Sequence, residues 1–277
     1  MIPYFCLMLA LKYLFKAPFH LLRSAAGRTL LLLFWRYGSK PRYQPTNVTF
    51  HQYHLEVPDC FSWMWQYEEI YVEKFYKFKT SNPAPIIYDC GANVGMSVLY
   101  FKELYPKASI KAFEAEPQIA IYLRKNLATN GISDVEIIEK AVWKDNEGVS
   151  FGEGQSDDAS IYGQGQKKKI ASLRLRDELA KETHIDFLKI DIEGAEIDVL
   201  PDCAKVLDRV QHLFVEFHAY IGQPQALAKV IEVIEKAGFR YYIDTNQHRK
   251  TPFVNHRYRN NEVMDLQLNI SAWKVLP

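Results

Sequence analysis

The chain of 277 residues has few cysteines, and their positions exclude several classes of protein. The four cysteines, Cys6, Cys60, Cys90 and Cys203, lie far apart and form no C-x-x-C pair. This spacing predicts neither a disulfide framework nor a zinc site, and it favours a reducing, cytoplasmic compartment. The formal net charge is only +1. The overall charge therefore gives no indication of a nucleic-acid partner.

The first 55 residues lack acidic side chains and also lack a long uninterrupted apolar run. They carry seven Lys or Arg residues, so the remainder of the chain has a formal charge of 1 minus 7, or −6. The basic residues interrupt the apolar stretches before about 18 apolar residues accumulate, so no membrane-spanning helix is expected. No basic residue precedes the first apolar run, which argues against a secretory signal.

This segment nevertheless supports two interpretations that the sequence leaves open. On a helix, one face would carry the basic residues Lys12, Lys16, His20 and Arg23. Such a face in residues 1–42 fits a peripheral contact with the inner membrane surface. It also fits a pair of helices that pack on the main domain or across a homodimer interface. We expect residues 1–55 to form an N-terminal extension and residues 56–277 to form the main domain.

Strands and helices alternate along most of the main domain. Strands are predicted near 86–90, 110–114, 135–139, 186–191, 211–217, 239–244 and 265–273. Helices are predicted near 95–105, 117–130, 173–182, 196–207 and 224–237, and Gly238 is expected to end the last of them. An amphipathic helix is predicted across 67–78, and the glycine-rich stretch 148–169 is predicted as a hairpin or loop. This alternation predicts an α/β fold whose mostly parallel sheet is covered by helices on both faces.

A glycine-marked corner, "DCGANVG" at residues 89–95, follows the first of these strands. A dinucleotide-binding fingerprint reads G-x-G-x-x-G, and the aligned residues here are Gly91, Asn93 and Met96. The Asn93 side chain would fill the space that a pyrophosphate needs. No G-K-[ST] follows, so a Walker A loop is absent as well.

The residues present at this corner indicate a different ligand. Asp89 stands at the carboxyl end of its strand, where it can meet an ammonium group directly or through water. Glu114 ends the next strand and can accept two hydrogen bonds from a ribose diol. These residues therefore predict a ligand that has a ribose and a cationic amino-acid end but no pyrophosphate. S-adenosylmethionine fits this description.

Four motifs in order resemble the FkbM family of S-adenosylmethionine-dependent methyltransferases: "IIYDCGANVGMSVLYFKELYP", "IKAFEAEPQ", "NLATNGISDVEIIEKAVW" and "DFLKIDIEGAEIDVL". The resemblance implies the class I, Rossmann-like methyltransferase fold, a seven-stranded sheet whose last strand is antiparallel. It also implies O-methylation of a saccharide or related metabolite. The residues it assigns to the cofactor are Asp89, Gly91, Asn93 and Gly95 in the loop, Glu114 at the ribose, and Ala141 and Val142 at the adenine.

The candidate catalytic residues follow the two strands after the hairpin. "KIDIEGAE" contributes Asp191 and Glu193, and "VEFHAY" contributes Glu216 and His218. Neighbouring parallel strands end at one edge of the sheet, so these side chains should converge. We expect His218 to act as the base that removes a hydroxyl proton, with Asp191 or Glu193 orienting it or binding the acceptor.

Other roles remain open for the same residues. His218 also fits a buried structural histidine, and Asp191 and Glu193 also fit the capping of a helix N-terminus. Asp191, Glu216 and His218 would suit a divalent cation, but the sequence does not fix their geometry, and no metal is predicted.

Two loops are candidates for contact with the ligands, and two alternative functions remain open. Residues 156–160 are expected to close over the cofactor, and the basic loop 246–260 is either solvated or binds an acceptor phosphate. The rival functions are a nicotinamide-dependent oxidoreductase or epimerase and a cofactor-binding module without turnover.

Overall fold

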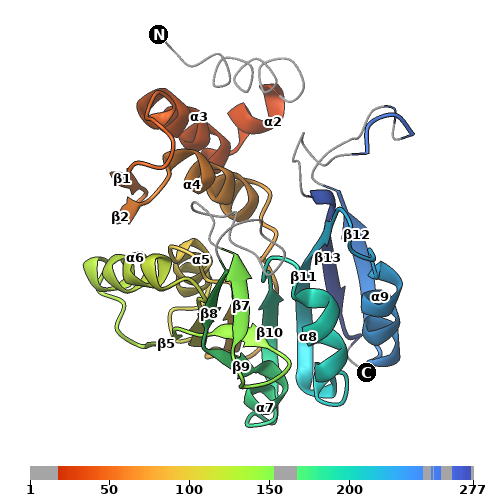
Figure 1. The fold of residues 1–277 in the computed structure, drawn as a ribbon. Helices are drawn as coiled ribbons and strands as arrows, with labels where there is room; N and C mark the ends of the chain where they lie inside the picture. The colour runs from red at the N-terminus through yellow and green to blue at the C-terminus, as the bar shows by residue number, and fades with distance from the viewer. Residues whose placement is uncertain (1–17, 153–166, 246–250, 252, 257–263, 276–277) are drawn as a thin grey trace. The chain divides into compact units, whose positions relative to one another are not determined.

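A computed structural model describes residues 18–152, 167–245, 251, 253–256 and 264–275 of the chain (Figure 1). Within it the chain forms two compact units. The first contains residues 1–77, 93–104 and 118–133, and the second contains residues 78–92, 105–117 and 134–277. The predicted division at residue 55 stays a prediction.

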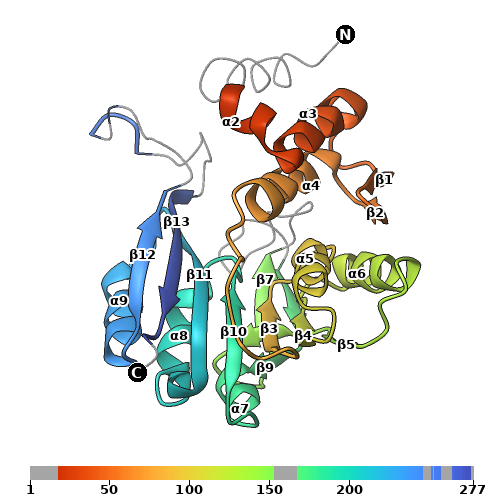
Figure 2. The same ribbon diagram turned by 180° about the vertical axis from the view of Figure 1, so that it is seen from behind.

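The second unit is built on a seven-stranded sheet with the order β12-β13-β11-β10-β3-β4-β5 (Figure 2). Its strands, in chain order, are β3 (Ile86–Cys90), β4 (Ser109–Phe113), β5 (Val135–Ile138), β10 (Ile185–Ile190), β11 (Val210–Tyr220), β12 (Arg240–Asp244) and β13 (Met264–Trp273). The pairings from β11 through β10, β3 and β4 to β5 are parallel. β13 is antiparallel to both β11 and β12. The prediction of a mostly parallel α/β sheet with an antiparallel last strand is confirmed.

Burial on both faces explains why the sequences of the central strands are almost continuously apolar. Every residue of β10 is buried, as expected for a parallel strand covered on both faces. Three helices of the same unit, α7 (Leu175–Leu179), α8 (Glu196–Cys203) and α9 (Leu227–Lys236), contribute to its hydrophobic core. Gly238 follows α9 with φ +82°, and its N–H donates to the Glu235 carbonyl, so it ends the helix as predicted.

The first unit contains α2 (Pro18–Arg23), α3 (Ala25–Tyr37), β1 (Thr46–Phe50), β2 (Tyr53–Val57), α4 (Cys60–Tyr67), η1 (Glu68–Val72), α5 (Met96–Leu104) and α6 (Pro117–Thr129). Its core includes a cluster of aromatic rings around Phe50, among them Trp63, Tyr67 and Tyr71. The side chain of Asn126 joins the β2 backbone to Val94 through three hydrogen bonds. No helix in the described part of the chain is long and apolar enough to cross a membrane.

One local prediction was wrong. The helix predicted across 67–78 instead ends at Val72, where the last turn is π-helical, and Lys74 adopts a left-handed φ of +60°. Residues 46–57 form an antiparallel hairpin that the sequence analysis did not predict. The predicted hairpin after residue 148 is confirmed by β7 (Val149–Gly152) and β8 (Lys167–Ile170), and a short parallel pair joins β6 (Ala141–Trp143) to β9 (Ser172–Arg174).

Candidate active site

Ionisable side chains gather at the carboxyl ends of four neighbouring strands in the second unit. Asp89 is the penultimate residue of β3, Glu114 follows β4, and Asp191 follows β10. Glu216 and His218 lie in β11, beyond the point where its register with β10 ends at Val215. In doubly wound sheets ligands bind at this edge, near the strand where the chain reverses direction across the sheet. That strand is β3, because the chain runs outward through β4 and β5 before it returns to β10.

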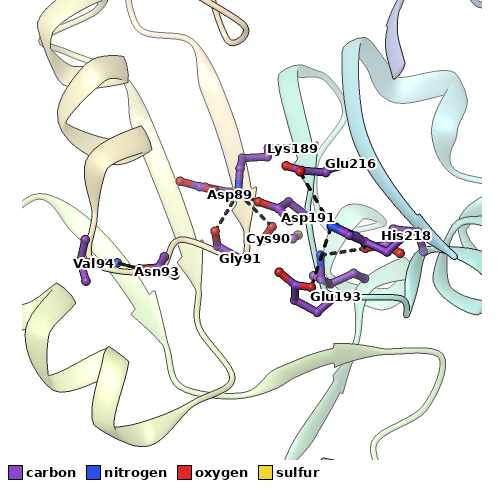
Figure 3. Close-up of polar contacts among 12 residues, drawn as sticks. Asp89, Cys90, Gly91, Asn93, Val94, Lys189, Asp191, Glu193, Glu216 and His218 are labelled. Carbon is purple, nitrogen blue, oxygen red and sulfur yellow. Dashed lines mark hydrogen bonds and ion pairs between the residues drawn. The ribbon is translucent and has the colours of Figure 1, made fainter. Parts of the chain in front are cut away.

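A buried lysine that the sequence analysis missed links two of these strands. Lys189 and Asp89 are register partners on β10 and β3, and the Lys189 ammonium lies 3.3 Å from an Asp89 oxygen and 3.2 Å from Asp191 (Figure 3). It also donates to the Gly91 carbonyl at 2.7 Å and to the Cys90 carbonyl at 3.5 Å. The signal was present in "FLKID", because a lysine inside a fully buried parallel strand requires a buried anion.

The glycine corner is constrained by the backbone of the next strand. Gly91 has φ +89°, and a Cβ at this position would lie 1.8 Å from the Asp191 carbonyl oxygen. In the first unit Asn93 also adopts a left-handed φ of +48°, and its side chain accepts a hydrogen bond from the Val94 N–H at 2.7 Å. Gly95 has φ +98°, and a Cβ there would lie 3.0 Å from the Leu123 side chain. The corner therefore needs glycine at residue 91 for steric reasons alone.

The structure brings Asp191, Glu193 and His218 together. One ligand-type atom from each lies within 4.8 Å of the others. His218 is almost fully buried, and its Nδ1 lies 3.2 Å from Glu196, while its Nε2 lies 3.8 Å from Glu193 and 3.8 Å from Glu216. The expected convergence of the candidate catalytic residues is therefore present. Sequence reasoning placed Glu196 at the helix start and gave it no role.

The charge on His218 follows from these neighbours. Burial by itself lowers the pKa of His218, but the carboxylates of Glu193, Glu196 and Glu216 outweigh it and hold the pKa well above the ordinary value. These carboxylates therefore favour the protonated form of the imidazole. A protonated imidazole cannot accept a proton, so the base role of His218 requires it first to lose its own.

The turn between β10 and α8 sets the direction of these side chains. Glu193 adopts φ +53°, which is uncommon for a residue with a Cβ, and Gly194 follows at φ +96°. Glu196 is fully buried, and its two oxygens accept the Ile192 and Gly194 N–H groups at 3.0 Å each. The Tyr220 hydroxyl donates to Glu193 at 3.2 Å. The predicted capping role thus belongs to Glu196, which satisfies N–H groups in the turn before α8.

The expected ribose and adenine residues lie beside one another in the second unit. Glu114 is mostly buried, and one of its oxygens accepts the Glu116 N–H at 2.9 Å. Ala141 packs in a small apolar cluster that Ala115 contacts. Val142 belongs to the main core of the unit, so its side chain is committed to packing. The cofactor roles of these residues stay predictions.

The loops expected to select the acceptor are not part of the described structure. Residues 156–160 lie outside the described residues. So do Arg249, Lys250, Arg257 and Arg259 of the basic loop.

The strand order and the antiparallel β13 are those expected of a class I, Rossmann-like methyltransferase. Residues 89–241 match the family described as Methyltransferase FkbM domain. This match covers more than half of the chain, and the protein belongs to that family. The family recognised from the sequence motifs is confirmed, and with it S-adenosylmethionine as the cofactor.

Three relatives define how far this similarity extends. Methyltransferase 1 of Beauveria bassiana is 26% identical over 48% of this chain and 64% of its own length. Methyltransferase sdnD of Sordaria araneosa is 28% identical over 48% of this chain and 66% of its own length. 2-O-methyltransferase NoeI of Sinorhizobium fredii is 26% identical over 51% of this chain and 68% of its own length. The chain spans less than two thirds of the first two relatives.

Proposed function

We propose that this protein is an S-adenosylmethionine-dependent O-methyltransferase that acts on a hydroxyl group of a saccharide or related metabolite. The observation that carries the proposal is the excess of carboxylates at the carboxyl edge of the sheet. Five carboxylates, Asp89, Asp191, Glu193, Glu196 and Glu216, surround Lys189 and His218, which carry at most two positive charges between them. The formal excess is at least three negative charges, which suits a cationic ligand.

The residues present fit the methyl donor that the family uses. When bound, S-adenosylmethionine supplies an electrophilic methyl group on a sulfonium centre. Glu114, at the end of the strand next to β3, would hold the ribose hydroxyls, and Asp89 at the end of β3 would face the amino-acid end through water or Lys189. Ala141 would contact the adenine, since it packs beside the residue that follows Glu114.

Methyl transfer to a hydroxyl also requires positioning and removal of a proton. Asp191 and Glu193 are partly exposed, with 23% and 28% of their side chains accessible, so they can contact an acceptor. The neighbouring carboxylates raise the pKa of His218 and favour its protonated form, so a carboxylate of this cluster is the candidate proton acceptor. The O-methylation itself is proposed from the similarity to 2-O-methyltransferase NoeI.

The test combines binding with turnover. Calorimetric titration with S-adenosylmethionine should show one site, and labelled methyl groups should transfer to hydroxylated saccharide acceptors. Binding without transfer across a broad acceptor panel would favour the module without turnover, and absence of binding by folded protein would overturn the proposal. The nicotinamide alternative is disfavoured by the family match and by Asn93, whose side chain lies against the loop backbone.

The proposed partners of the N-terminal segment are a membrane surface and a second copy of the chain. Residues 1–17 lie outside the described structure. In the described part, α3 exposes Leu32 and Trp35, which suits either partner. A cytoplasmic location stays a prediction.

A further inference from the structure

We propose that Asp191, Glu193 and His218 bind one divalent cation at the carboxyl ends of β10 and β11. One oxygen or nitrogen atom of each residue lies within 4.8 Å of the other two. Atoms that share a cation at about 2.1 Å lie up to about 4.2 Å apart, so small side-chain rotations would complete the set. The site is inferred from geometry, and only its chemical role rests on the proposed function.

The orientation of His218 is the first argument. Its Nδ1 faces Glu196 at 3.2 Å, and Glu196 is itself held by two backbone N–H groups. Histidine ligands of metals usually donate their second N–H to a carboxylate or carbonyl in this way, which fixes the ring and presents the other nitrogen. Here the presented atom is Nε2, and Figure 3 shows the His218 ring beside Glu193 and Glu216.

The surroundings of that nitrogen are the second argument. The His218 side chain is 2% exposed, and Nε2 makes no hydrogen bond to any described residue. Instead it points between carboxylate oxygens of Glu193 and Glu216, each 3.8 Å away. That separation exceeds a hydrogen bond but suits two ligands on one cation. A buried ring nitrogen aimed at carboxylates at this distance is therefore well placed to share a cation with them.

The charge balance is the third argument. Lys189 already contacts Asp89, Asp191 and the Gly91 carbonyl, so it cannot neutralise the carboxylates nearer to β11. Glu216 also receives an N–H from Gln267, which holds its position. With His218 as a neutral ligand, five carboxylates face only Lys189, and a divalent cation would offset two of the resulting four excess charges. Glu216 would supply a fourth ligand or bind a metal-bound water.

The ligand set indicates which cations fit. Two carboxylates suit Mg²⁺ and Mn²⁺, whereas an imidazole nitrogen favours Mn²⁺, Fe²⁺ or Zn²⁺ over Mg²⁺. In the proposed reaction the cation would bind the acceptor oxygen and acidify its hydroxyl. The proton would pass through a carboxylate of the cluster to solvent, the oxygen would form the new bond to the methyl carbon, and the carbon–sulfur electron pair would remain on sulfur as a thioether.

The test uses Mn²⁺ as the probe on the full chain after treatment with a chelator. Electron paramagnetic resonance should detect one bound Mn²⁺ per chain. Glu193→Gln and His218→Gln should each weaken binding by at least about tenfold. Asp208→Asn removes an exposed carboxylate of the same unit and should leave the affinity unchanged.

A spectroscopic signal separates a coordinated imidazole from general attraction to acidic groups. Electron spin echo measurements should show nitrogen modulation from bound Mn²⁺ in the wild-type protein and in Glu193→Gln, and none in His218→Gln. If His218→Gln fails to fold, the nitrogen modulation in the wild-type protein and in Glu193→Gln still shows whether an imidazole binds the cation.

Two outcomes would overturn the proposal. One is no Mn²⁺ binding by folded protein that still binds S-adenosylmethionine. The other is Mn²⁺ binding without nitrogen modulation, or with equal affinity in all variants, because the ion would then be attracted only by surface charge. Mn²⁺ binding with nitrogen modulation but without S-adenosylmethionine binding would support the cation site and count against the proposed function alone.

Discussion

The two ends of strand β10 use buried carboxylates in opposite ways. At the amino end, Asp186 is 2% exposed and accepts three hydrogen bonds: from the Thr80 hydroxyl at 2.8 Å, the Asn82 amide at 3.0 Å and the Ile86 N–H at 2.9 Å. These donors hold the pKa of Asp186 below its ordinary value despite burial. Three hydrogen-bond donors therefore satisfy the negative charge of Asp186, and this residue stabilises the fold.

At the carboxyl end, carboxylates outnumber the cationic groups. Asp191, Glu193 and Glu216 share two cationic side chains with Asp89 and Glu196, at separations of 3.2 to 3.8 Å. Such an arrangement costs stability unless a ligand completes it. The comparison teaches that buried charge alone does not mark a functional site, whereas an excess of one sign of charge at a strand end does.

The largest effect is expected where a cation is removed from the carboxyl end. Lys189→Met takes the nearest cation away from buried Asp89, so the free energy of unfolding should fall by about 3–5 kcal/mol. Urea unfolding would measure it, with the exposed Lys229→Met as the matched control. Adding Asp89→Asn should recover part of the loss, and a loss below about 1 kcal/mol would show that the cation is not needed there.

The second prediction concerns the carboxyl end of β10, where the loop after β3 approaches the loop after β10. Gly91→Ala places a Cβ against the Asp191 carbonyl at a left-handed φ, and we expect it to cost roughly 2–4 kcal/mol. Gly131→Ala has a similar φ of +71° with no atom within 4 Å of its Cβ, so it isolates the backbone strain. Equal losses in the two variants, measured by thermal unfolding, would argue against the steric contact.

The amino end should respond through its hydrogen bonds and through pH. Asp186→Asn should cost about 1–3 kcal/mol at neutral pH, because buried donors lose a charged acceptor. The folded-state pKa of Asp186 is depressed, so its contribution is present above the ordinary Asp pKa and is lost as pH falls through the folded value. The difference in stability between wild type and variant should therefore shrink on acidification below about pH 4. A difference that stays constant to lower pH would contradict this assignment.

Substitution of Glu114 is expected to change the free energy of unfolding least, but to weaken the binding of S-adenosylmethionine strongly. Glu114→Gln keeps an oxygen for the Glu116 N–H, so unfolding should change by no more than about 0.5 kcal/mol. Affinity for S-adenosylmethionine should fall by roughly tenfold or more, because charge-assisted bonds to the ribose would be lost. The exposed Glu136→Gln serves as the control, and calorimetric titration measures both. Unchanged affinity would remove Glu114 from the cofactor site.

Several parts of this protein were decided by local sequence. Mostly apolar runs such as "IIY" and "IDFLKI", separated by helical patterns, placed six of the seven strands within one residue, since burial on both faces leaves few other residues acceptable. The seventh, β11, extends three residues beyond its predicted end at residue 217. Gly91 and Gly95 marked the corner because both adopt a positive φ. The convergence of Asp191, Glu193 and His218 followed from one rule, that parallel neighbours end at the same edge.

Other features required the tertiary structure. The helix predicted across 67–78 ended early, because helical spacing of aromatics cannot show that Lys74 takes a left-handed conformation. Lys189 and Glu196 were assigned no role, because their partners lie on β3 and β11, about 100 and 22 residues away in sequence. The sequence determined which residues reach the carboxyl edge of the sheet. Only the tertiary structure decided which charges meet there and how far one sign exceeds the other, because such pairings depend on distances of a few ångströms between distant segments.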